Sequence, residues 1–245
     1  MRPAIMTASA LISLAACAQQ SPETPPAVTE AASVLIEPET TLDITITPPD
    51  YSAATNLIRP NMSVPDTADM SRGDVPRDDY GRPYTYEYLG QTLPAFSGPL
   101  VNGDIFTSSD LSGKWTVIEV WGLWCHDSMT DAPYAAALST ALAQDPALNF
   151  MSIHTPQSAD HIDRAYKSYG SVGAYFSDKG YSYPTVVDTD ASLRDILKIR
   201  WTPTYILVAP DLSVQAFRTG LADADGEPVK DFVRQISDIR GAWTP

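Results

Sequence analysis

The sequence predicts an α/β fold in which helices cover both faces of a central mixed sheet, preceded by a long disordered tether. From about residue 84 onward, strand-like and helical patterns follow one another in the order β-α-β-α-β-β-α, which calls for a sheet between helical layers. Residues 115–121 form a dense apolar run, typical of a buried parallel strand. Residues 18–85 are instead rich in Pro, Thr, Ser, Ala and acidic residues, so we expect a flexible tether there and the folded domain over residues 86–245.

The expected strands are short runs of apolar, β-branched and aromatic residues. The Pro94-Ala-Phe96 and Val101-Asn-Gly-Asp104 segments suggest a hairpin before the longest of these strands. A turn at Pro210-Asp211 predicts that the two strands beside it pair in antiparallel fashion. In chain order, the expected strands cover residues 84–89, 115–121, 148–153, 183–187, 204–208 and 214–218.

Helical patterns fill the intervals between these strands and close the chain. Pro133 lies inside the first helix and predicts a kink, whereas Pro228 suits the first turn of the last helix. The expected helices cover residues 127–143, 159–169, 192–199 and 228–240.

The N-terminus has the features of an export signal. Arg2 supplies a short positive region, and residues 5–16 form an apolar run that is too short to span a bilayer. The run ends in Leu14-Ala15-Ala16-Cys17, which resembles a bacterial lipobox and implies a signal peptide over residues 1–17 with lipidation of Cys17. Cleavage after Ala18, which would release a soluble periplasmic protein, is the alternative.

Both interpretations of the N-terminus predict the same number of free thiols in the mature protein. Cys17 is either alkylated or removed, so Cys125 is expected to be the one free thiol of the mature protein. The lipobox resemblance implies an anchor on the periplasmic side of a bacterial membrane, and Ala18 after the lipid-bearing cysteine favours the outer membrane. An exported location is oxidising, which makes a lone thiol notable.

The net charge and the types of potential metal ligand exclude two classes of partner. The formal net charge is −14 and no basic stripe is present, so nucleic acid is not expected as a partner. Cys125, His126 and Met129 are soft or borderline metal ligands, but adjacent Cys and His rarely bind one ion well, so no metal is expected. No other cofactor is expected.

The most distinctive segment is Glu-Val-Trp-Gly-Leu-Trp-Cys-His-Asp-Ser over residues 119–128. It places Cys125 where a buried strand ends and a helix begins, and unpaired N–H groups at a helix N-terminus favour a thiolate. Glu119 lies within the strand, where a charge is costly unless it is paired or neutralised. It is either a proton acceptor or donor beneath the cysteine, or a carboxylate that reaches water or pairs with a lysine such as Lys114.

This segment resembles the active site of the thioredoxin superfamily, and more narrowly its TlpA-like or redoxin branch. Four features carry the resemblance, which covers roughly residues 90–240: Trp124-Cys125, Glu119 six residues before the cysteine, Pro133 eight residues after it, and Thr202-Pro203 in a loop like the family's cis-proline loop. The resemblance implies a thioredoxin-like fold, a cis bond before Pro203, and a loop that faces Cys125 and pairs with an extended substrate.

The chain departs from the family at the second redox position. Members that exchange disulfides usually carry Cys-x-x-Cys, whereas this chain has Ser128 there. A serine hydroxyl cannot attack a mixed disulfide, so release requires an outside thiol. A peroxiredoxin is less well matched, because its Pro-x-x-x-Thr-x-x-Cys pattern meets Ile118 and Gly122 here.

The resemblance therefore predicts single-cysteine thiol–disulfide exchange at Cys125. Glu119 and Ser128 complete the expected catalytic set, and Trp124, Thr202 and Pro203 are the expected substrate-binding residues. Protein thiols or disulfides, or glutathione, in the periplasm are the expected partners. The alternative is a binding or scaffold module without enzymatic activity, which would use the groove near Trp124 and the cis-proline loop.

Overall fold

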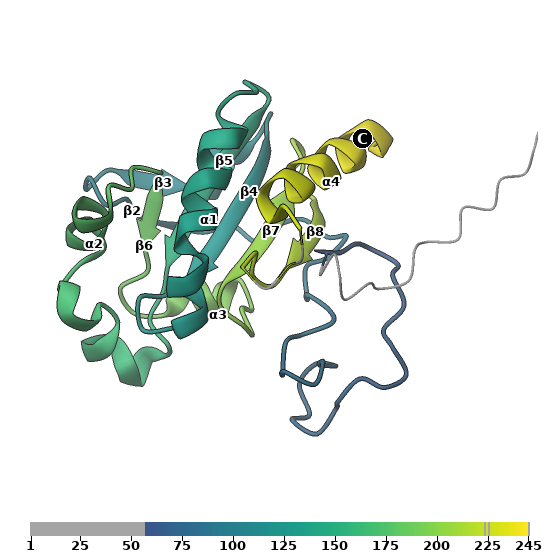
Figure 1. Cartoon of the computed structure of the whole chain (residues 1–245), viewed down its shortest axis with the longest axis horizontal. Helices are drawn as coiled ribbons and strands as arrows, with labels where there is room; N and C mark the ends of the chain where they lie inside the picture. Colours follow the sequence, from purple (N-terminus) through teal and green to yellow (C-terminus); the bar gives the residue numbers. More distant parts are fainter. Residues whose placement is uncertain (1–56, 223, 225, 245) are drawn as a thin grey trace, which may run out of the picture. The chain divides into compact units, whose positions relative to one another are not determined.

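The computed structural model describes residues 57–222, 224 and 226–244. A six-stranded mixed sheet forms its centre, with strand order β1-β8-β7-β4-β5-β6 (Figure 1). The strands of this sheet are β1 (Leu57–Ile58), β4 (Trp115–Trp121), β5 (Leu148–His154), β6 (Thr185–Val187), β7 (Thr204–Val208) and β8 (Val214–Arg218). Strands β4, β5 and β6 pair in parallel, and the remaining pairs are antiparallel.

A separate hairpin and several helices complete the fold. The hairpin joins β2 (Ser97–Pro99) to β3 (Ile105–Thr107), on either side of the turn that the sequence predicts. The helices are η1 (Ser108–Leu111), α1 (His126–Leu142), η2 (Ala159–Arg164), η3 (Lys167–Tyr169), α2 (Val172–Lys179), α3 (Ser192–Ile196) and α4 (Pro228–Ala242). Among the described residues, no helix has both the length and the apolar character that crossing a membrane requires.

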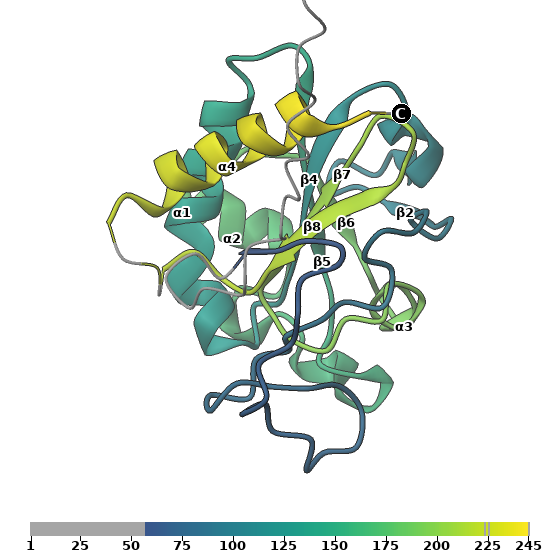
Figure 2. The ribbon, with the colours of Figure 1, turned by 90° about the vertical axis from the view of Figure 1, so that its right-hand side faces the viewer.

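The two faces of the sheet bury separate cores. On one face, α1, α2 and α4 pack against Val117, Tyr205 and Leu207. On the other face, α3, η1 and the β2–β3 hairpin pack against Ile118, Ile206 and neighbouring apolar side chains. Figure 2 shows α1 and α4 on one side of the sheet and α3 on the other. Alternate residues of each strand feed the two cores, as the pleat of a sheet requires. The predicted arrangement of helices on both faces is confirmed.

Part of the predicted tether is folded. Leu57 and Ile58 pair with Arg218 and Phe217 of β8, so β1 adds an edge strand to the sheet (Figure 2). Arg77 is buried, donates to the carbonyl of Gly81 at 2.7 Å and pairs with a neighbouring aspartate. The prediction of a flexible tether is therefore wrong for residues 57–85, because its Pro-rich composition conceals apolar anchors. Residues 1–56, which include the predicted signal peptide, Cys17 and the rest of the tether, lie outside the described residues.

Three local predictions also differ from the structure. The predicted strand at residues 84–89 is a series of turns, in which Tyr86 is buried and its hydroxyl donates to the carbonyl of Leu197 at 3.0 Å. The predicted helix at residues 159–169 is two 3₁₀ segments, η2 and η3, and His161 has a non-helical backbone inside η2. The helix predicted at residues 192–199 is α3, which ends at Ile196 because Lys198 adopts a left-handed conformation with φ of 53°.

Helix α2 was not expected from the sequence, although its boundaries carry recognisable signals. The side chain of Ser171 accepts a hydrogen bond from the N–H of Ala174 at 3.0 Å and caps the helix start. Gly180 adopts a left-handed conformation with φ of 71° and ends the helix. Its buried side chains, which include Tyr175 and Phe176, pack beneath β4 and β5.

Candidate active site around Cys125

Cys125 is the N-cap residue of α1 and ends the short connection from β4 to this helix. Its backbone is extended, with φ of −88° and ψ of 130°, and its carbonyl accepts from the N–H of Met129 at 3.2 Å. The thiol is partly exposed and donates to the carbonyl of Thr202 at 3.3 Å. The structure therefore brings together Cys125 and the predicted cis-proline loop, which are 77 residues apart at this contact.

The Thr202–Pro203 peptide bond is cis. Both residues are buried, so the Thr202 side chain does not offer an open contact surface. Trp201, which precedes them, is half-buried. The group of Thr202 that faces the thiol is therefore its backbone carbonyl.

Trp124 is fixed by a hydrogen bond and by a glycine. Its indole N–H donates to the carbonyl of Thr155, after β5, at 2.7 Å. The indole ring also lies over Gly122, where any Cβ would collide with the Trp124 ring nitrogen. Gly122 is therefore required for the close approach of this ring. The half-buried indole forms a fixed wall next to Cys125.

Ser128, three residues after Cys125, is fully buried. Its hydroxyl accepts a hydrogen bond from the N–H of Gly122 at 3.3 Å. This contact ties the first turn of α1 to the end of β4. The hydroxyl therefore serves the geometry of the strand-to-helix junction, and it lacks the sulfur that a second exchange step needs.

Glu119 lies beneath the site in the middle of β4 and is 1% exposed. It does not reach water or pair with Lys114 in the described structure, because its Oε1 has only the Tyr205 hydroxyl as a partner, at 3.4 Å, and its Oε2 is buried without one. Burial raises the pKa of Glu119 well above 4.5, and the charge of Asp131 raises this pKa further.

Asp131 is a second buried carboxyl group that the sequence did not reveal, and the Tyr205 hydroxyl contacts both it and Glu119. The Tyr205 hydroxyl donates to Asp131 at 2.6 Å, and the N–H groups of Leu221 and Ala222 donate to the same carboxylate. Burial raises the pKa of Asp131, whereas these hydrogen bonds lower it. The Tyr205 hydroxyl has a single proton, and the shorter contact, to Asp131, receives it. Glu119 therefore receives no proton from Tyr205, so the Glu119 carboxyl is the one that holds its own proton.

Neither Asp131 nor Tyr205 is among the site residues that the sequence predicts. Asp131 lies in the helix expected over residues 127–143, where an aspartate is usually exposed to solvent. Tyr205 lies in the strand expected over residues 204–208. A polar tip on a buried tyrosine requires a partner, and that requirement links the two residues.

The raised pKa of Glu119 predicts a stability that depends on pH. Between about 4.5 and its folded pKa, Glu119 holds a proton in the folded chain and loses it in the unfolded chain, so stability falls as pH rises through this window. Glu119→Gln stays neutral and escapes this loss, which is about 1.4 kcal/mol per pH unit within the window. Urea unfolding at pH 4, 6 and 8 should show the variant gaining on the natural protein as pH rises. A difference between the two proteins that is the same at all three pH values would show that folding does not shift the pKa of Glu119.

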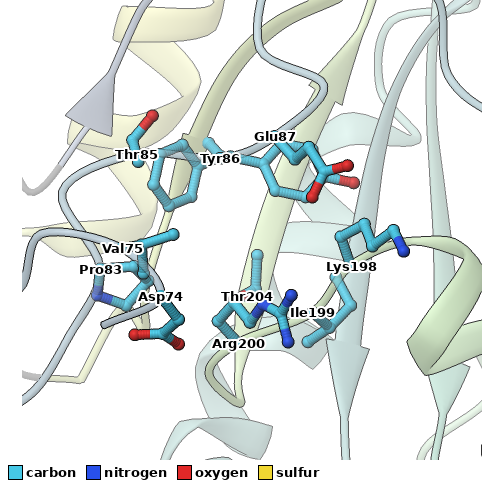
Figure 3. A pocket seen from close by; sticks show the side chains of 11 residues that line it. Asp74, Val75, Pro83, Thr85, Tyr86, Glu87, Lys198, Ile199, Arg200 and Thr204 are labelled. Atoms are coloured by element: carbon cyan, nitrogen blue, oxygen red, sulfur yellow. The ribbon is translucent and has the colours of Figure 1, made fainter. Parts of the chain in front are cut away.

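A small cavity lies away from the thiol, between residues 74–87 and the loop that leads to Pro203. Its volume is about 110 Å³, and Figure 3 shows Thr85, Tyr86 and Glu87 on one side of it, with Lys198 and Arg200 on the other. None of the predicted site residues lines it. The segment that was expected to be tether thus packs beside the loop that faces Cys125.

Comparison with known proteins places the chain in a family. Two curated relatives come from Bacillus subtilis (strain 168). The chain is 27% identical to thiol-disulfide oxidoreductase ResA over 131 residues, which cover 54% of this chain and 67% of ResA. It is 25% identical to thiol-disulfide oxidoreductase YkuV over 134 residues, which cover 54% of this chain and 86% of YkuV.

Solved structures agree on the fold. A putative protein disulfide isomerase from Bacteroides thetaiotaomicron superposes with a TM-score of 0.50 at 20% identity, over 63% of this chain and 91% of that one. The fold is thioredoxin-like, and the chain is homologous to the thiol-disulfide oxidoreductase ResA. Residues 89–217, more than half of the chain, match the AhpC/TSA family. The chain therefore belongs to the AhpC/TSA family.

Proposed function

We propose that this chain performs thiol–disulfide exchange with a single cysteine, Cys125. The observation that carries the proposal is the placement of a partly exposed thiol at the N-cap of α1, 3.3 Å from the carbonyl of Thr202. A helix N-terminus supports a negative sulfur, and the loop backbone beside it is positioned to pair with an extended substrate. Membership in a redoxin family whose relatives are named thiol-disulfide oxidoreductases supports the same chemistry.

The first step joins Cys125 to its substrate. The Cys125 thiolate attacks one sulfur of a substrate disulfide, a new sulfur–sulfur bond forms, and the other substrate sulfur leaves as a thiolate that takes a proton from solvent. The substrate disulfide is reduced at the leaving sulfur, while Cys125 becomes oxidised in the mixed disulfide. We assign the positioning of the substrate to Trp124 and to the backbone of Thr202 and Pro203. The protonated carboxyl of Glu119, within β4, is assigned the role of a proton store.

Ser128 stops the reaction at this point. It has no thiolate with which to displace the substrate, so release depends on a thiol from outside the motif. Protein thiols and glutathione are the proposed partners. A peroxidase activity is less well supported despite the family name, because Ile118 and Gly122 stand where the peroxiredoxin pattern has Pro and Thr.

Restoring the second cysteine tests this division of labour. In Ser128→Cys, the new sulfur takes the place of a hydroxyl one helical turn from Cys125, so the variant should form an internal disulfide and release a bound thiol by itself. The natural protein should retain a stoichiometric mixed disulfide after reaction with a small disulfide, and the variant should retain none. Ser128→Ala is the matched control and should behave as the natural protein does. Persistent adduct on Ser128→Cys would show that residue 128 does not face the sulfur of Cys125.

We further propose that the protein is exported and lipid-anchored. The support is the lipobox-like Leu14-Ala15-Ala16-Cys17 sequence after an apolar run, with a periplasmic-facing site on the outer membrane as the location that it favours. A thiol that works by mixed disulfides suits an oxidising compartment, where disulfides persist.

The anchor has a direct chemical signature. Mass spectrometry of the mature protein should find acyl groups on an N-terminal Cys17, and Cys17→Ala should move the protein from the membrane fraction to the soluble fraction. More than one acyl chain is needed, since a single chain gives marginal attachment. A mature chain that begins at Gln19 would instead establish soluble export and remove the anchor from the proposal.

A further inference from the structure

A positive charge lies against the residue that precedes the thiol. Arg194, in α3, places its guanidinium carbon 5.7 Å from the centre of the Trp124 ring. Helix α3 lies between β6 and the loop that carries Pro203. The charge of Cys125 acts on Arg194, which links the guanidinium electrostatically to the thiol. A cation stacked on an aromatic wall thus borders the reaction centre.

The polar groups of this guanidinium are not used by the fold. Among the described residues, none accepts a hydrogen bond from it, none forms an ion pair with it, and its Nη1 is buried without a partner. A guanidinium carries five N–H donors, so most of its binding capacity is free. Burial lowers the pKa of Arg194, while the charges of Asp195, Cys125 and Asp188 oppose this shift.

The position of Arg194 is nevertheless fixed through its backbone. Asp188 accepts from the N–H of Arg194 at 3.1 Å and from the Thr155 hydroxyl at 2.9 Å. The carbonyl of Thr155 in turn holds Trp124. Thr155 therefore anchors the indole, and Asp188, which is bound to Thr155, holds the helix that presents the guanidinium without forming an ion pair with it.

We propose that Arg194 binds the carboxylate of a small thiol that releases the mixed disulfide at Cys125. The inference rests on the proposed single-cysteine exchange, because Ser128 leaves that release to an outside thiol. A planar guanidinium matches a carboxylate in bidentate fashion, and it offsets the repulsion of an anion by a chain of net charge −14. The thiol is only partly exposed beside Trp124, which favours a small molecule over the surface of another protein.

The release step balances without any further reactant. The thiolate of the carboxylate-bearing thiol attacks the outer sulfur of the mixed disulfide, and the bond from that sulfur to Cys125 breaks. The incoming thiol is oxidised in a new disulfide with the former substrate sulfur, and Cys125 is reduced and leaves as a thiolate. The proton lost by the incoming thiol goes to solvent, from which Cys125 regains one.

Three thiols of similar size test the proposal on the full chain. The Cys125 adduct with 2-mercaptoethanol is prepared first, since this group is uncharged. Its loss is then followed by intact mass after acid quenching, with 3-mercaptopropionate, 2-mercaptoethanol or cysteamine as the attacking thiol and with rates corrected for thiolate fraction. The natural protein should react about tenfold faster with 3-mercaptopropionate than with 2-mercaptoethanol, as one charge-assisted contact implies, and slowest with cysteamine.

Variants separate a specific contact from a general charge effect. Arg194→Gln should abolish the preference for the carboxylate, measured within this variant as the ratio of the rate with 3-mercaptopropionate to the rate with 2-mercaptoethanol, so that any change in Cys125 as a leaving group cancels. Arg234→Gln removes the same charge from the exposed side of α4 and should keep the preference. Equal rates for the three thiols in the natural protein, or an equal loss of preference in both variants, would overturn the proposal and leave single-cysteine exchange intact. Failure of Cys125 to form any adduct would overturn both.

Discussion

Cys125→Ser is expected to abolish capture of thiol partners completely while the fold persists. The thiol is the one group at the site that can form the covalent bond, and its hydrogen bond to the Thr202 carbonyl can be made by a hydroxyl as well. Circular dichroism and urea unfolding should match those of the natural protein within about 0.5 kcal/mol. Non-reducing electrophoresis of the protein recovered from cells checks the result.

The same variant separates exchange chemistry from a binding or scaffold role. If the chain only binds a partner beside Trp124 and the cis-proline loop, Cys125→Ser is nearly silent and loss of contact surface matters instead. Trp201→Ala tests the surface better than a substitution of Thr202 does. Trp201 is half-buried, whereas Thr202 is buried, so a substitution of Thr202 would disturb packing. Partner capture that survives Cys125→Ser but fails in Trp201→Ala would replace the exchange proposal with the binding one.

Asp131→Ala is expected to be the most damaging substitution for stability. It removes the acceptor of the Tyr205 hydroxyl and of the N–H groups of Leu221 and Ala222, and the Asp131 carboxylate itself is 1% exposed. Each buried donor left without an acceptor costs about 1–3 kcal/mol, so the free energy of unfolding should fall by about 4 kcal/mol. Chemical denaturation at pH 7 measures this.

Two further variants assign the loss to hydrogen bonding. Asp131→Asn keeps one oxygen acceptor at the same place, so it should lose about half as much as Asp131→Ala. Tyr205→Phe removes one donor and should relieve part of the penalty when it is combined with Asp131→Ala. A loss below about 1 kcal/mol in Asp131→Ala would show that water or a rearranged backbone satisfies these donors.

The strands that the sequence predicted most closely lie in the buried centre of the sheet. Residues 115–121, 204–208 and 214–218 have the predicted bounds, because runs rich in β-branched and aromatic residues mark them and the turn at Pro210-Asp211 separates the last two. The approach of Cys125 to the loop at Thr202 was likewise expected, from a family resemblance at both ends of the contact. Residue identity and spacing were enough for these features because each is local or carries a family motif.

Features that arise from tertiary contacts were not predictable in this way. Leu57 and Ile58 lie among prolines and acidic residues, and only pairing with β8 makes them an edge strand. Asp131 looks like an ordinary polar residue of a helix until the N–H groups of residues 221 and 222 fold against it. Arg194 is one of several charged residues around α3, and its stacking on Trp124 depends on the turn at Gly122. Long-range packing overrides local pattern at each of these positions.

The claim that Cys125 is a working single thiol is tested most directly by the mass of what it carries in the cell. The full chain is recovered from its native cells without reductant, with free thiols blocked by alkylation at the moment of lysis, and the peptide that contains Cys125 is analysed before and after reduction. We expect a substantial fraction of this peptide to be linked by a reducible bond to a cysteine of another protein or to a small carboxylate-bearing thiol. A Cys125 peptide that is found only in alkylated form, with no reducible partner, would contradict the account.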